Sequence, residues 1–179
     1  MLTILAIPFA KSSTSSKGHI LGEERFDMTT GKWYRFIDLD TDLTGNELVL
    51  GEVVLAMATA NRGTTKKANS LDTTNVVVLG VGAGATGDVA ESASSSARNY
   101  CWIQLSGRCS TVKKKAAGGS DTIAVGDVVI ADAATDSKCI ALGDSTAVTG
   151  IYLKAAFGYC LVAAIDADTT VDCYLRWLR

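Results

Sequence analysis

Alternation of apolar and polar residues near the end of the chain is the sequence feature that most limits its fold. From Val171 to Trp177, apolar residues alternate with Asp172, Tyr174 and Arg176. A period of two is that of a β-strand with one buried face. Other short apolar runs, bounded by turn residues, cover 33–39, 48–58, 75–79, 100–105, 128–130 and 157–165. Regularly spaced short strands predict an all-β fold, either a β-sandwich or a β-barrel.

Composition supports this prediction and excludes several classes of protein. Hydrophobic residues make up 47% of the chain, enough for a packed core, and charged residues only 20%. The formal net charge of −2 gives no overall attraction to nucleic acid or to an acidic membrane. Helical signals are limited to residues 65–71 and 88–99, where serines favour caps and turns. No apolar run reaches the roughly 18 residues that a transmembrane helix needs.

The first 18 residues are predicted to form an arm and a linker, followed by a β-domain over 19–179, with 19–75 and 76–179 as candidate subregions. Residues 1–10 are apolar, and 11–18 are a polar tether rich in serine. The first segment lacks the positive start of a signal peptide, so we do not expect it to direct secretion. We expect the arm to dock on a partner through Leu2, Ile4, Leu5, Ile7 and Phe9. The alternative is an edge strand on the chain's own domain.

For docking of this arm, the free energy gained by burying apolar side chains nearly equals the entropic cost of ordering the backbone. Burial of four of its large apolar side chains would contribute about 6–12 kcal/mol. Ordering ten residues of backbone costs about 10 kcal/mol. We therefore expect the arm to need backbone pairing with a sheet edge, or several copies acting together in an oligomer.

One short pattern occurs twice. The segment Gly51–Ala56 (Gly-Glu-Val-Val-Leu-Ala) resembles Gly126–Ala131 (Gly-Asp-Val-Val-Ile-Ala). Each predicts a glycine turn, an acidic residue facing water and a strand entering the core. The two copies are either related hairpins or a coincidence between common patterns.

Candidate catalytic motifs are present but incomplete. Gly82-x-Gly84-x-x-Gly87 follows a β-branched run, as in a dinucleotide-binding turn, but no convincing helix or acidic ribose ligand follows. His19, the single histidine, lies beside the linker, where nothing holds a general base in place. The carboxylates of Asp38, Asp40, Asp42, Asp166 and Asp168 are interpreted as solvated turn residues, since EF-hand spacing is missing. The sequence therefore predicts no enzyme, no metal and no cofactor.

Cysteines and lysines complete the set of candidate groups. Five cysteines without a CxxC pair are interpreted as buried free thiols, which suits assembly in cytosol. Lys113, Lys114 and Lys115 are interpreted as an exposed loop that could contact an acidic partner surface. Nucleic-acid binding is not expected because no aromatic residues interleave with the lysines.

The second half of the chain carries a succession of motifs that resembles a known family. These are Tyr100–Cys109 (Tyr-Cys-Trp-Ile-Gln-Leu-Ser-Gly-Arg-Cys), Ile123–Val129 with its Gly-Asp turn, Phe157–Leu161 and a closing strand over 171–178. The succession, over roughly residues 76–178, resembles the C-terminal β-region of tailed-phage capsid decoration (cement) and head proteins.

That resemblance implies a mechanical function. Decoration proteins bind the outside of a capsid, often as trimers, and bridge neighbouring capsid subunits. We therefore expect a structural virion protein whose partners are the major capsid protein and further copies of itself, assembled in the host cytoplasm. The alternative is a carbohydrate- or receptor-binding module of a phage fibre or surface adhesin, with Trp33, Tyr34 or Tyr152 stacking on sugars.

Overall fold

The computed structural model describes residues 22–39, 50–56, 62–64, 77–83, 99–115, 121–132, 138–144 and 156–176. Within these ranges the prediction of an all-β chain is confirmed, because ten strands and one short 3₁₀ helix are present and no α-helix. The strands are β1 (Glu24–Asp27), β2 (Lys32–Leu39), β3 (Val53–Ala56), β4 (Arg62–Thr64), β5 (Val78–Gly82), β6 (Asn99–Lys113), β7 (Val128–Ala131), β8 (Cys139–Ala141), β9 (Ala156–Val162) and β10 (Thr170–Leu175), and the 3₁₀ helix is η2 (Leu142–Asp144).

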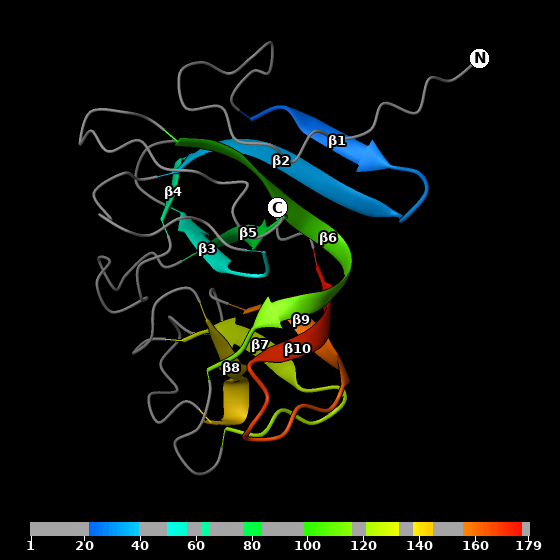
Figure 1. The fold of residues 1–179 in the computed structure, drawn as a ribbon, viewed down its shortest axis with the longest axis vertical. Coiled ribbons are helices and arrows are strands. Elements are labelled where there is room, and N and C mark those ends of the chain that lie inside the picture. Colours follow the sequence, from blue (N-terminus) through cyan, green and yellow to red (C-terminus); the bar gives the residue numbers. More distant parts are fainter. Residues whose placement is uncertain are drawn as a thin grey trace.

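Five strands between residues 32 and 106 form what we call the first unit. β2 pairs antiparallel with the first half of β6 and parallel with β4. β4 pairs with β3, β3 pairs with β5, and β5 returns to β6. β1 adds to β2 as an antiparallel hairpin strand. The pairings therefore lead from β2 around to β2 again (Figure 1). Inward side chains of these strands form one buried cluster.

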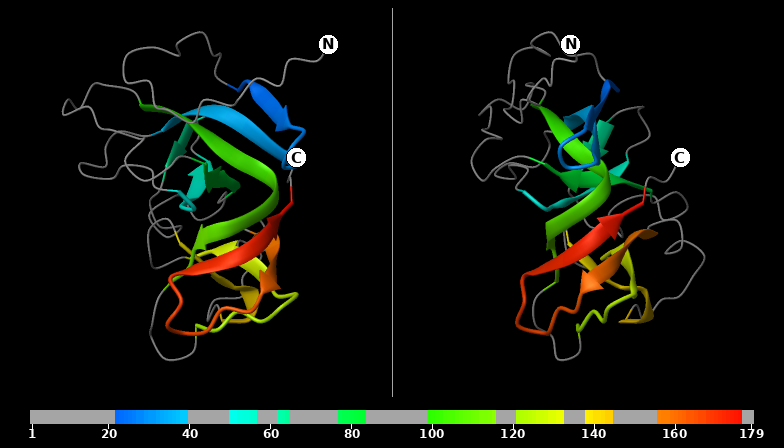
Figure 2. Two further views of the ribbon diagram at one scale, coloured as in Figure 1. Left: turned by 45° about the vertical axis from the view of Figure 1, so that its right-hand side comes forward. Right: turned by 90° about the vertical axis from the view of Figure 1, so that its right-hand side faces the viewer.

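The second unit repeats this arrangement with the second half of β6. β6 pairs with β10, β10 with β9, β9 with β7, and β7 with β8. Directly after β6, Lys114 forms a parallel bridge to Cys139 of β8. Figure 2 shows β6 running from one unit into the other. The units meet within this strand, whereas the sequence indicated a boundary near residue 75.

Strand registers coincide between the two units. β3 pairs with β5, and β7 with β9, with one extra residue at the same place on the partner strand in both cases. The partners are Val53–Val81, Val54–Gly80 and Leu55–Val78 in the first unit, and Val128–Tyr159, Val129–Gly158 and Ile130–Ala156 in the second. The parallel pairings also correspond. Leu39 of β2 pairs with Gly63 of β4 in the first unit, and Lys114 pairs with Cys139 of β8 in the second. The chain is therefore built from two structurally equivalent units.

The turn before each repeated strand has the same hydrogen bonds. Gly51 N–H donates to the Gly82 carbonyl, and Gly82 N–H donates to the carbonyl of the residue after Gly51. Gly126 N–H donates to the Cys160 carbonyl, and Cys160 N–H donates to the carbonyl of the residue after Gly126. Both turn glycines have positive φ, 87° and 90°, which other residues adopt only with strain. The repeated sequence pattern therefore marks equivalent positions, as related hairpins would require.

Alternation along the strands divides the core between the units. Inward residues of the first unit, such as Ile37, Val54 and Ile103, form one buried cluster. The outward residues Val53 and Val81 belong instead to the buried cluster that fills the second unit. The outer face of β3 and β5 therefore packs on the second unit and holds the two units together.

Candidate interaction surfaces

An apolar sheet face on the outside of the second unit remains open to solvent. Its centre is a ladder of paired residues, Val128, Tyr159 and Tyr174, on β7, β9 and β10. These side chains are 39%, 36% and 41% exposed. The two tyrosine rings stack with centroids 5.5 Å apart and an interplanar angle of 21°. We call these three residues the open face.

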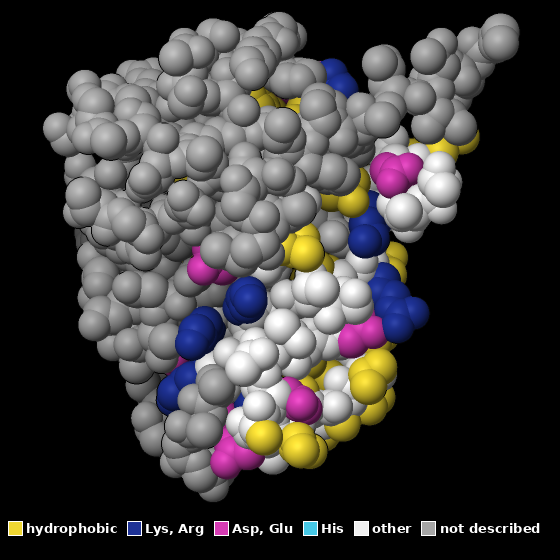
Figure 3. Space-filling model, in the orientation of Figure 1, with side chains coloured by type: hydrophobic (Ala, Val, Ile, Leu, Met, Phe, Trp, Pro, Cys, Tyr) yellow, Lys and Arg dark blue, Asp and Glu magenta, His cyan; other side chains and the backbone are white. Residues whose placement is uncertain are grey.

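The second unit has further exposed apolar side chains near the ends of the strands that carry the open face. Val125 lies in the turn at Gly126, Val162 ends β9 opposite Asp172, and Ile165 lies in the turn before β10. Figure 3 shows hydrophobic side chains beside charged ones along the outer edge of the second unit. A contiguous exposed apolar patch rimmed by polar groups is typical of an interaction surface.

One ion pair borders this surface. Arg108 is the cross-strand neighbour of Tyr174, and its guanidinium donates to both carboxylate oxygens of Asp172, with the shortest contact 2.6 Å. Hydrogen bonding and charge from Asp172 raise the pKa of Arg108. Arg108 is the more exposed partner, so the pair offers a fixed positive group at the edge of the open face.

The aromatic residues predicted to bind sugars lie elsewhere and are mostly covered. Tyr34 is 4% exposed, and burial raises the pKa of its hydroxyl. Trp33 is half-buried and contacts Phe26, with ring centroids 5.1 Å apart. Tyr152 lies outside the described residues. The prediction of an exposed Tyr34 is therefore wrong, because the hairpin of β1 and β2 places it on a covered face.

The predicted lysine loop is also corrected. Lys113 ends β6, and Lys114 continues the strand to its bridge with Cys139. Lys114 is 1% exposed, and its Nζ donates to the Lys115 carbonyl at 3.1 Å. Lys115 pairs with Asp121 at 3.7 Å. Lys114 takes the interior position that Leu39 has in the first unit, so it is part of the core and cannot serve as a surface contact.

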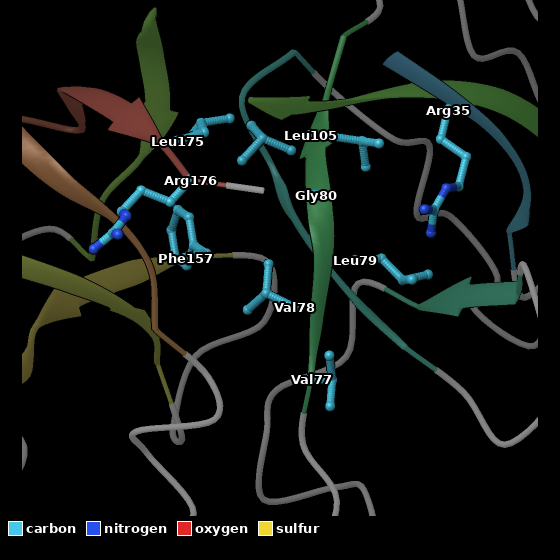
Figure 4. Close-up of a pocket in the computed structure, with 10 residues that line it drawn as sticks. Arg35, Val77, Val78, Leu79, Gly80, Leu105, Phe157, Leu175 and Arg176 are labelled. Carbon is cyan, nitrogen blue, oxygen red and sulfur yellow. The ribbon is translucent and has the colours of Figure 1, made fainter. Parts of the chain in front are cut away.

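The structure has a small pocket between the two units (Figure 4). Val78 lies on the side of β5 toward Phe157 of the second unit, and Leu79 lies on the side toward Arg35. The pocket volume of about 160 Å³ is below the range of about 300–1,000 Å³ that is usual for small-molecule sites. Arg35 also pairs with Glu24 at 2.6 Å. The pocket marks the junction of the units and brings together no converging catalytic groups.

All five cysteines are buried and none forms a disulfide, which confirms the interpretation as buried thiols. Burial raises the pKa of Cys160 and Cys173. It also raises the pKa of Cys139, against the opposing positive charge of Lys114. A raised pKa keeps these thiols protonated and weakly nucleophilic.

The carboxylates and the glycine-rich motif have structural positions. Asp38 is 6% exposed within β2, so its interpretation as a solvated turn residue is wrong. Asp166 accepts the Asp121 N–H, and Asp168 accepts the Ile165 N–H, as turn residues do. Gly82 ends β5. Asp40, Asp42, Gly84, Gly87 and His19 lie outside the described residues, as do the arm residues Leu2, Ile4, Leu5, Ile7 and Phe9.

Searches for metal sites and for known relatives gave no match. Within the described ranges no group of three or more His, Cys, Asp or Glu side chains could hold a metal ion. No helix in the described part of the chain is long and apolar enough to cross a membrane. No protein-family model, curated protein or solved structure matches the sequence or the fold.

Proposed function

We propose that the chain is a structural virion protein that binds the outside of a tailed-phage capsid and stabilises it by bridging capsid subunits. In this proposal it is a decoration (cement) protein and acts without catalysis. Its partners are the major capsid protein and further copies of itself, which we take to form a trimer. It joins the capsid surface after synthesis in the host cytoplasm.

The observation that carries this proposal is the open apolar face on the second unit. The face lies on three neighbouring strands and includes a stacked tyrosine pair. Tyrosine supplies a large, rigid contact area at low entropic cost, as at many protein interfaces. A surface of this kind suits binding to other proteins rather than turnover of a small substrate.

The motifs that resemble decoration proteins agree with the element boundaries. Tyr100–Cys109 lies in β6, the Gly126 turn precedes β7, Phe157–Leu161 lies in β9, and the closing strand is β10. The aromatic strand also has a structural role at the junction of the units. Gln104 Nε2 donates to the carbonyls of Ser106, Gly107 and Arg108, where β6 passes from one unit to the next. These correspondences support the proposal because the motif residues fall on strands and turns as the family pattern requires.

Cosedimentation with phage heads tests the proposed function. The full chain is incubated with purified heads of its own phage that lack the protein, and the bound copies per head are counted after centrifugation. We expect saturable binding with a stoichiometry set by the capsid lattice. The absence of binding at high protein concentration would overturn the proposal.

The role of the arm is tested with a pair of variants. In one variant Leu2, Ile4, Leu5, Ile7 and Phe9 are replaced by serine. In the control, Lys11 and Lys17 of the linker are replaced by serine and the apolar residues remain. We expect the first variant to lose head binding and the control to retain it. Equal binding by both would remove the arm from the proposed contact.

A carbohydrate- or receptor-binding module is the second candidate, favoured by the exposed Tyr159–Tyr174 pair. Aromatic rings with a polar hydroxyl are suited to a contact that is partly apolar and partly wet. A glycan array probed with the full chain separates the candidates. Specific glycan binding that is lost in Tyr159→Ser, together with no binding to heads, would favour this second function.

A further inference from the structure

Because the two units are equivalent, the structure contains two copies of the same sheet face. Val53, Val81 and Gln104 in the first unit correspond to Val128, Tyr159 and Tyr174 in the second, by the shared registers. The first set is 1%, 0% and 4% exposed, and the second set is 39%, 36% and 41% exposed. One face is therefore covered inside the chain, and its equivalent is open.

The structure also shows what covers the first face. The outer side of β5 lies against Phe157 and Leu175, two inward residues of the second unit. The turn at Gly51 packs on β6, where Lys113 N–H donates to the Gly51 carbonyl at 2.7 Å. The equivalent turn at Gly126 has no atom within 4 Å of the position of a Cβ. The first unit thus docks its outer face and turn onto the interior edge of the second unit.

The surface that receives this contact also has an equivalent. By the shared registers, Phe157 and Leu175 correspond to Leu79 and Leu105 of the first unit. These two leucines lie with Arg35 at the edge of the first unit's interior and border the pocket shown in Figure 4. The chain therefore has an open donor face on the second unit and an equivalent of the acceptor edge on the first unit, beside the junction of the two units.

We propose that the open face of one copy binds the acceptor edge at Leu79, Leu105 and Arg35 of a second copy of this chain. This contact continues between chains the docking that already joins the two units within one chain. It is heterologous, because each copy uses different surfaces toward its two neighbours. Such contacts close into a ring when the rotation between copies allows it, and otherwise extend as a filament. The inference gives the surface for the self-association in the proposed function, but it does not depend on capsid binding.

Native mass spectrometry and sedimentation velocity of the full chain test this contact. We expect wild type to be oligomeric at micromolar concentration, and Tyr159→Glu to weaken self-association about tenfold or more, as loss of a buried aromatic contact does. The control is Met28→Glu, which places the same charge on a 62% exposed side chain in the β1–β2 turn. Tyr159→Ser serves as a second variant if the glutamate lowers the melting temperature. A monomeric wild type, or unchanged assembly of both Tyr159 variants, would overturn the proposal.

Cross-linking distinguishes a head-to-tail contact from a twofold one. Tyr159→Cys and Arg35→Cys are prepared separately and joined with a short bismaleimide, since the native cysteines are buried. We expect the mixture to cross-link and Tyr159→Cys alone to remain uncross-linked. Cross-linking of Tyr159→Cys to itself would indicate a twofold contact and contradict the proposal. A monomeric chain that still binds heads would contradict the head-to-tail contact between copies while leaving the proposed function intact.

Discussion

The turns at Gly51 and Gly126 form a matched pair for testing the two-unit architecture. They have nearly the same φ and the same hydrogen bonds to their partner strands. They differ in the atoms that pack against the glycine. A Cβ at Gly51 would lie 1.7 Å from the Thr111 carbonyl oxygen, whereas a Cβ at Gly126 would meet nothing within 4 Å. Alanine at each position therefore separates backbone strain from the docking of the units.

The expected destabilisation can be estimated for each substitution. Gly126→Ala forces alanine into the left-handed region, at a cost of about 1–2 kcal/mol. Gly51→Ala has the same strain, and in addition a clash with backbone that cannot rotate away, worth about 1–3 kcal/mol. It also strains the hydrogen bond from Lys113 N–H, which contributes about 0.5–1.5 kcal/mol. We expect a loss in the free energy of unfolding of about 3–6 kcal/mol for Gly51→Ala.

Urea denaturation followed by tryptophan fluorescence and by circular dichroism measures this difference. With a slope of about 2 kcal/mol per molar urea, the midpoint should fall by about 0.5–1 M for Gly126→Ala and by about 1.5–3 M for Gly51→Ala. Coincidence of the two signals checks that unfolding is two-state. Equal midpoints for the two variants would contradict the clash expected at Gly51, since the Gly51 turn would then not be packed on β6.

Three further predictions follow from buried or hydrogen-bonded groups. In urea unfolding, the free energy of unfolding of Lys114→Met should stay within about 1.5 kcal/mol of the wild-type value. Lys114→Ala should lower it by about 2–4 kcal/mol, because removal of the buried lysine stem leaves a cavity. Equal losses for the two variants would contradict the core position of Lys114. A thiol-specific dye at about pH 8 should label none of the five buried cysteines within minutes in the folded chain and all of them in urea, and rapid labelling when folded would contradict their burial. Hydrogen bonds from Thr30 and Thr29 lower the pKa of Asp27 in the folded chain below the ordinary value of 3.8. The ionised Asp27 therefore stabilises the folded state fully above that pH, and this stabilisation is lost as the pH falls through the lower folded pKa. The melting temperature of wild type should therefore exceed that of Asp27→Asn above about pH 4 and converge with it in stronger acid, and a gap independent of pH would contradict this assignment.

Alternation in the sequence predicted β10, which has one buried face, and short apolar runs predicted strands such as β3 that are buried on both faces. Residues 171–175 of the alternating segment lie in β10, and residues 78 and 79 of the run at 75–79 begin β5. The repeated Gly-acid-Val-Val pattern indicated the equivalence of the units, although it left coincidence open. The positive φ of both glycines explains why the pattern begins with that residue.

Two of the incorrect predictions, on the lysine run and on Tyr34, failed because the burial of these residues depends on contacts distant in sequence. The run of lysines had the local signature of a solvated loop, and only the parallel bridge to Cys139 places Lys114 in the core. Tyr34 was predicted to be exposed, but the β1 hairpin and the Arg25–Trp102 contact lie on its side of the sheet, and it is buried. In neither case does the sequence show which segment provides the cover.

The open face was missed, although part of its signal was present. Tyr174 lies on the polar side of the final alternation, which predicts exposure. Tyr159 lies in a run that was interpreted as a buried strand, so the stacked pair was not expected. The contrast with the covered face at Val53 and Val81 depends on the fold, because only the registers reveal which residues are equivalent.

Electron cryomicroscopy of phage heads incubated with the full chain would show directly whether the chain decorates the capsid. We expect added density on the outer capsid surface, in which pairs of small β-units lie over the boundaries between capsid subunits and contact one another head to tail. Heads with no added density at saturating protein concentration would contradict it.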